Sequence, residues 1–141
     1  MNEPLSTEQL SREIALAFPP NAETPTDRFI EANPDVLWLS APVSLMVLVP
    51  AYLSWCARHA LDQRGSLVPD HTVRALGEFG RSKDPTSAHL NFKHMCSLEQ
   101  RAVVAKFLHW CLNPELILDT EQIKRALKYW EPRATGGANA A

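Results

Sequence analysis

The sequence predicts an all-α protein, a single compact helical bundle of five or six helices around a central apolar helix. Three observations indicate this class. Apolar residues recur at helical spacing in several segments. Two serines are each followed three residues later by a glutamine, which is the capping-box pattern that begins a helix. The segment 36–57 carries no charged residue, as is typical of a helix that is buried on all sides.

The first helix is expected to begin after Ser6, with Gln9 at the capping-box position. An apolar stripe at helical spacing follows, and the double proline at 19–20 ends the helix because proline supplies no backbone N–H. Three prolines between residues 19 and 27 indicate a loop. A short second helix is expected near residues 27–32.

The long uncharged segment is long enough to cross a bilayer. Pro42 and Pro50 interrupt it, however, and the apolar faces of the other helices need a surface to pack against. We therefore expect a core helix over 42–62, with Leu48 and Leu53 buried, and no membrane span. Pro50 either kinks this helix or divides it in two, and a proline in a helix can also leave a free carbonyl for a ligand.

Asp70 is expected to cap a further helix that stops at Gly80. The next residues, 81–88, form a polar loop. The stretch 89–96 alternates only loosely between polar and apolar residues, so no regular element is expected there.

The clearest helix lies over 97–112, which forms the centre of the bundle together with 42–62. Ser97 is its cap, Gln100 completes the capping box, and most of its surface is apolar. Thr120 is expected to cap the last helix. The chain of 141 residues thus fits one helical domain over 1–130, followed by a low-complexity, disordered tail over 131–141.

Two of these segments resemble a known group of proteins. Residues 50–53 read PAYL, and residues 97–108 read SLEQRAVVAKFL. This pairing resembles a group of small uncharacterised bacterial helical proteins with a PAYL helix and a later SLxxQRxxVxxFL helix, over roughly residues 38–112. The resemblance implies a helical bacterial domain, and it transfers no catalytic residue.

Charge is unevenly distributed along the chain, although the formal net charge is only −2. Residues 1–35 hold seven acids against two arginines, whereas residues 57–109 hold eight bases against five acids. We expect these two regions to attract each other in the fold. The small net charge argues against a general nucleic-acid coat.

The chain has three cysteines, an odd number without paired spacing, which indicates reduced thiols in a cytoplasmic protein. The N-terminus shows no basic region followed by an apolar run, so no signal peptide is expected.

One alternative is a metal-dependent or thiol enzyme that uses His89, His94 and Cys96, with Cys56 and His59 as a further C-x-x-H pair. The spacing matches no standard zinc finger or metalloprotease helix, and no acid is evident to orient a catalytic histidine. We therefore expect no metal, no cofactor and no catalytic residue.

The candidate interface residues are Trp130, which ends the last helix beside the tail, and the basic residues Arg74, Arg81 and Lys83. Weak nucleic-acid binding is a second alternative, because aromatic residues are interleaved with these bases. The expected function is a non-enzymatic protein-interaction module of accessory, regulatory or immunity type. Its partner is expected to be another protein, with homo-oligomerisation open and no membrane partner.

Overall fold

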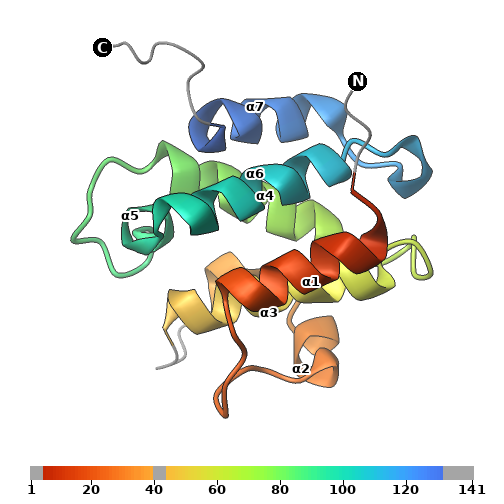
Figure 1. Ribbon diagram of the computed structural model, residues 1–141, viewed down its shortest axis with the longest axis horizontal. Coiled ribbons are helices and arrows are strands. Elements are labelled where there is room, and N and C mark those ends of the chain that lie inside the picture. Colours follow the sequence, from red (N-terminus) through yellow and green to blue (C-terminus); the bar gives the residue numbers. More distant parts are fainter. Residues whose placement is uncertain (1–4, 40–43, 132–141) are drawn as a thin grey trace.

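A computed structural model describes residues 5–39 and 44–131, which form seven α-helices and two short 3-10 helices (Figure 1). The elements are α1 (Thr7–Ala17), α2 (Asp27–Ala32), η1 (Val36–Trp38), α3 (Leu45–His59), α4 (Val68–Arg81), α5 (Phe92–Met95), α6 (Leu98–Trp110), η2 (Pro114–Leu116) and α7 (Thr120–Trp130). The predicted all-α class is confirmed. The described residues form seven α-helices where five or six were predicted, and the short helix α5 lies in the stretch 89–96, where no regular element was expected. The predicted tail, apart from Glu131, lies outside the described residues.

The helices pack around one continuous core. Figure 1 shows α1 running across α3, with α6 beside it and α7 lying over α4 and α6. The helix α3 contacts α1, α2, α4 and α5, and most of its residues are buried, so its predicted central position is confirmed. Leu48 and Leu53 are buried as expected. Within the described part of the chain, every helix is too short or too polar to span a bilayer.

The helix α3 runs without a break through Pro50, so the proline does not divide it. Ser44 caps it through a side-chain oxygen that accepts a hydrogen bond from the Met46 N–H at 3.0 Å. Residues 42 and 43 of the predicted segment 42–62 lie outside the described residues. At its other end the helix closes at His59, three residues before the predicted end.

Local capping signals account for most helix starts. Both capping boxes are confirmed, at Ser6 with Gln9 and at Ser97 with Gln100. The expected cap at Thr120 is wrong by one residue, because the Asp119 carboxylate accepts the first backbone N–H groups of α7. The short helix predicted near 27–32 is confirmed as α2.

The predicted limits of α4 are wrong at both ends. The helix begins at Val68, before Asp70, and has no side-chain cap. Pro69 occupies its first turn, where a missing N–H costs nothing because those amides have no partner within the helix. Gly80 does not end the helix, which continues to Arg81.

Gly80 serves helix packing instead. A Cβ atom placed there would lie 2.6 Å from Tyr129 Cβ and 2.9 Å from Trp130 Nε1, closer than side chains pack. The glycine therefore allows α7 to lie directly against α4, and the Trp130 indole donates a hydrogen bond to the Leu76 carbonyl at 2.8 Å.

The expected attraction between the acidic and basic regions is confirmed. Acids of residues 1–35 form ion pairs with bases of residues 57–109 across the bundle. The pairs are Asp27 with Arg58, Asp35 with Arg74 and Glu13 with Lys106. They connect α1, α2 and the turn before η1 to α3, α4 and α6.

Candidate functional site

A surface pocket of about 120 Å³ lies between α1, the loop that follows it, and α3. Its α1 wall contains Ile14 and Phe18, and its loop wall contains Pro19, Pro20 and Pro25. Ile14 and Phe18 are buried in the core, so this wall is continuous with the interior of the bundle. The pocket therefore reaches from the surface to buried side chains of the core, and polar side chains such as Asn21 and Thr24 also line it.

The α3 wall follows one face of that helix. Met46, Pro50, Ser54 and Arg58 recur every four residues, and Ala51 lies beside Pro50. Pro50 has no N–H, so the Met46 carbonyl lacks the helical hydrogen bond that residue 50 would otherwise donate. Met46 and Pro50 both line the pocket.

The loop wall is held in place by its own hydrogen bonds. The backbone N–H of Asn21 donates to the Thr24 hydroxyl at 2.9 Å, and the Glu23 N–H donates to the Asn21 side-chain oxygen at 2.7 Å. The neighbouring prolines fix their own backbone φ angles. These hydrogen bonds and the prolines restrict the conformations that the loop wall can adopt.

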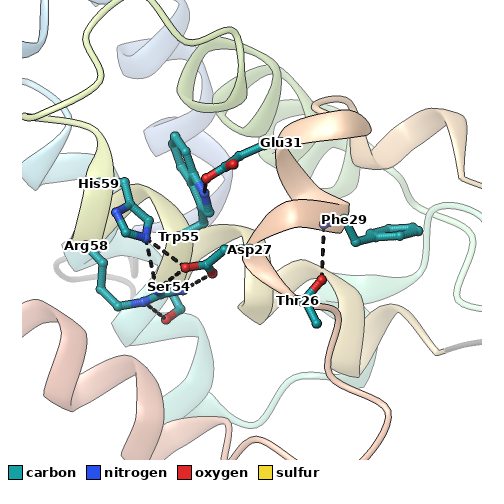
Figure 2. A network of polar contacts seen from close by, with 8 residues as sticks. All are labelled: Thr26, Asp27, Phe29, Glu31, Ser54, Trp55, Arg58 and His59. Atoms are coloured by element: carbon teal, nitrogen blue, oxygen red, sulfur yellow. Dashed lines mark hydrogen bonds and ion pairs between the residues drawn. The ribbon is translucent and has the colours of Figure 1, made fainter.

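A polar network closes the α3 end of the pocket (Figure 2). Asp27, in the first turn of α2, accepts two hydrogen bonds from the Arg58 guanidinium, both at 2.8 Å, and lies 2.9 Å from His59 Nε2. Arg58 Nε also donates to the Ser54 hydroxyl at 3.1 Å. The bonds from Arg58 lower the pKa of Asp27 to about 2, so its carboxylate stays ionised and balances the arginine.

A second contact fixes α2 against α3. The Trp55 indole N–H donates to the Glu31 carboxylate at 2.9 Å, and Figure 2 shows the two side chains bridging the helices. Together with the pair of Asp27 and Arg58, this contact holds α2, and hence the end of the loop wall, against α3. The described lining of the pocket includes no acid, histidine or cysteine. Arg58 is the charged side chain of this lining, and the Asp27 carboxylate balances it.

The basic residues predicted as interface lie away from this pocket. Arg74 pairs with the partly buried carboxylate of Asp35 at 3.3 Å. Arg81 and Lys83 lie exposed at the end of α4 and in the following loop, and Arg81 pairs with Glu78. Arg81 and Lys83 therefore lie near each other at the exposed end of α4. Arg74 has a different role, because its ion pair connects α4 to the turn before η1.

Trp130, the aromatic candidate for an interface, is only 2% exposed, because Gly80 admits its ring into the contact between α4 and α7. Trp38 is the tryptophan at the surface, with 84% of its area exposed. Phe79 and Phe92 are fully buried and contact each other, so neither offers its ring for stacking on a nucleic-acid base.

The residues of the enzyme alternative do not assemble into a reactive site. His94 Nε2 lies 2.9 Å from the Ser82 carbonyl, and His89 is exposed in the loop. Burial raises the pKa of the Cys96 thiol to about 12, which opposes formation of a thiolate. Among residues 5–39 and 44–131, no three histidine, cysteine or acidic side chains are placed to hold a metal ion.

The second pair of this alternative, Cys56 and His59, lies on α3, with the cysteine buried and the histidine against Asp27. Burial raises the pKa of the Cys56 thiol to about 12, and His59 faces Asp27 instead of the cysteine. Cys56, Cys96 and Cys111 are all free and buried.

No protein-family model matches this chain, and neither a curated protein nor a solved structure is significantly similar to it.

Sequence reasoning did not locate the pocket. It singled out Pro50 as a source of a free carbonyl and identified the proline-rich stretch after residue 18 as a loop. The missing information was that this loop returns against α3, which depends on the long-range contact between α1 and α3.

Proposed function

We propose that this protein is a non-enzymatic protein-interaction module that binds a partner protein through the pocket between α1 and α3. One observation carries the proposal: a pocket of about 120 Å³, lined by both apolar and polar side chains, opens at the surface beside a polar network whose charges are balanced. Protein interfaces concentrate their binding energy where one anchor side chain fills such a pocket and polar groups surround it. The role is accessory, regulatory or immunity-type.

The proposed compartment is the cytoplasm of a bacterial cell. Three free, buried cysteines support it, because reducing compartments keep thiols unpaired. The bacterial origin rests on the resemblance of the segments 50–53 and 97–108 to small bacterial helical proteins.

Site-specific photocrosslinking tests the proposal. A benzophenone amino acid replaces Val47, which lines the pocket, and in a control replaces Lys124, which is exposed on α7. We expect crosslinked adducts with one defined protein from position 47 and none from position 124. Adducts at position 124 alone would show that the partner binds another face, and adducts with a second copy would identify a homo-oligomer.

A blocking variant provides the matched test of function. Ala15 is exposed and lines the pocket, so Ala15→Trp fills the entrance without changing the core. Ala32→Trp places the same ring at an exposed position of α2 outside the pocket. We expect Ala15→Trp alone to remove the adduct formed from position 47. Equal adduct formation in both variants, or stoichiometric zinc or iron in the purified protein, would contradict the proposal.

A further inference from the structure

We infer that a basic surface at one end of the bundle binds an acidic segment of a protein partner. The cations of this basic surface are Lys83, Lys93, Arg101 and Lys128. None of them lines the pocket between α1 and α3, so the inference goes beyond the proposed function and does not depend on what the pocket binds. Three features carry it: four elements each bring a cation to this end, the fold pairs none of these cations with an acid, and two of them repel each other.

The elements that carry the cations meet at one end of the bundle. Figure 1 shows the ends of α4 and α7 beside α5 and the start of α6. The Lys93 ammonium donates a hydrogen bond to the Tyr129 carbonyl in the last turn of α7, and Arg101 Nε donates to the Lys93 carbonyl at 3.1 Å. Lys128 precedes Tyr129 on α7 and is exposed. These contacts place cations from three helices on one surface.

The end of α4 joins the same surface. His94 Nε2, on α5, lies 2.9 Å from the carbonyl of Ser82, the residue that follows α4. Lys83 comes next in the chain and is exposed. The loop after α4 therefore adds a fourth cation beside α5.

The four cations have no acidic partner among residues 5–39 and 44–131, where all ion pairs involve other bases. Residues 81–101 hold four bases against two acids. Of these two acids, Asp84 accepts hydrogen bonds from the backbone N–H and the hydroxyl of Thr86, and Glu99 is exposed in the first turn of α6. The basic surface therefore carries positive charge that contacts within the described chain do not neutralise.

Two of the cations are held close together. Lys93 is half-buried, with its Nζ 5.9 Å from the centre of the Trp130 ring. Burial lowers the pKa of Lys93, and the positive charge of Arg101 lowers it further. Arg101 uses only its Nε within the described part of the chain, so its two Nη groups are available to a ligand. A carboxylate that binds both side chains would offset their repulsion through charge-assisted hydrogen bonds.

The surroundings of the basic surface favour a protein carboxylate over the phosphates of a nucleic acid. The rings of Phe79, Phe92 and Trp130 are buried at this end, so they cannot stack on bases. The chain as a whole has a formal charge of −2, and residues 1–35 hold seven acids against two arginines. A long polyanion would therefore meet repulsion beyond the basic surface, whereas a short acidic segment would contact its cations alone.

Titration of the isotope-labelled full chain with three short probes, followed by NMR chemical shifts, tests the inference. The probes are blocked hexaglutamate, blocked hexaglutamine and single-stranded hexathymidylate. We expect saturable shifts at His94, Arg101 and Tyr129 with hexaglutamate and none with hexaglutamine. Hexathymidylate should bind at least about five-fold more weakly, which corresponds to one missing stacking contact.

The pKa of Lys93 provides a second readout. Bound carboxylates offset the charge of Arg101, so hexaglutamate should raise this pKa, measured from the chemical shift of the Lys93 Cε against pH. An unchanged pKa of Lys93 at saturation would show that the probe binds elsewhere.

Charge reversal at the two exposed lysines provides the decisive variant. Lys83→Glu combined with Lys128→Glu leaves the contact of Lys93 with α7 intact. We expect this variant to bind hexaglutamate about ten-fold more weakly, because each exposed ion pair contributes up to about five-fold. Arg64→Glu is the matched control, since Arg64 is exposed in the loop before α4, and the 14 residues of that helix, about 20 Å, separate it from the basic surface. At about 150 mM salt the screening length is about 8 Å, so the control should bind as the unmodified protein does.

Hexathymidylate that binds as tightly as hexaglutamate would overturn the assignment of a protein partner in favour of a nucleic acid. Absence of hexaglutamate binding, or equal weakening in Arg64→Glu and in the double variant, would overturn the site itself. Crosslinking from position 47 reports on the pocket, so adducts there together with a failed hexaglutamate titration would leave the proposed function standing. Hexaglutamate binding without any adduct from position 47 would have the opposite meaning.

Discussion

A methyl group added at Gly80 tests how α4 packs against α7. The added Cβ would lie 2.6 Å from Tyr129 Cβ and 3.1 Å from Trp130 Cδ1. The Tyr129 Cβ is attached directly to the backbone of α7, so it cannot move aside by a rotation of the side chain. Gly80→Ala must therefore shift one helix relative to the other.

The expected loss is the difference between two opposing effects. Alanine is favoured over glycine inside a helix by about 1 kcal/mol. Overpacking of a well-packed contact costs about 1–3 kcal/mol, and displacement of the Trp130 indole weakens its bond to the Leu76 carbonyl by up to about 1 kcal/mol. We expect Gly80→Ala to lower the free energy of unfolding by about 1–2 kcal/mol.

Gly77 in the same helix is the matched control. A Cβ placed there has ordinary contact only, at 3.9 Å from Ala126 Cβ, so Gly77→Ala gains about 1 kcal/mol from helix propensity. Urea unfolding monitored by far-UV circular dichroism measures both variants, and an unchanged slope against urea shows that the comparison is valid. If Gly80→Ala had the same free energy of unfolding as Gly77→Ala, the close contact between α4 and α7 would be refuted.

Three further predictions concern single side chains. Asp27→Asn should lower the unfolding free energy by about 1 kcal/mol at neutral pH, a value discounted because Asp27 is 41% exposed. The folded-state pKa of Asp27 is lowered to about 2. This stabilisation is therefore complete above the ordinary pKa of 3.8 and is lost as the pH falls from there towards 2. Acid unfolding curves of the unmodified protein and of Asp27→Asn that stay parallel through this window would contradict the prediction. Glu23→Gln, in the exposed loop, is the control and should change stability by less than about 0.5 kcal/mol. Cys96 should react with a thiol reagent only after unfolding, because burial raises its pKa to about 12, and rapid labelling of the native protein would restore the thiol-enzyme alternative. Ile117→Asn should raise the free energy of unfolding by about 1 kcal/mol, because Ile117 is 78% exposed and its backbone φ of 54° is strained for a β-branched residue. A variant that is less stable in thermal unfolding would show that the isoleucine makes a contact that offsets this strain.

Helix starts were the most predictable part of the fold. Both capping boxes form because the serine and the glutamine lie within one turn and need nothing else from the chain. Asp70 shows where such local reasoning fails, since the preceding proline is equally suited to a first helical turn and α4 begins at Val68, before both. Val68 is buried in the core, so packing favours the earlier start.

Glycine and tryptophan were misread for a common reason. In the sequence, Gly80 stands where a glycine commonly ends a helix, and Trp130 stands at the end of the last helix, where a side chain is often exposed. In three dimensions the missing side chain of the first makes room for the ring of the second. Neither residue carries a local sign of the other, because they lie on different helices, 50 positions apart in the sequence.

The pocket was predictable only in its parts. The prolines indicated a restricted loop and a missing hydrogen-bond donor in α3, but their separation along the chain gave no indication that they line the same pocket. The packing of α1 on α3 brings them together. The charge asymmetry indicated correctly that the acidic region would meet the basic one, although not which residues would pair.

By itself, the sequence determined the helical class, the capped starts of α1 and α6, and the burial of most of α3. Hydrogen bonding within one turn and the unfavourable exposure of apolar surface to water both act on residues close together in the chain. The tertiary structure decided where α4 begins and ends, that Trp130 is buried and Trp38 exposed, and that a pocket opens beside Pro50. These features depend on how side chains from helices far apart in the sequence pack closely together, and local sequence patterns do not contain that information.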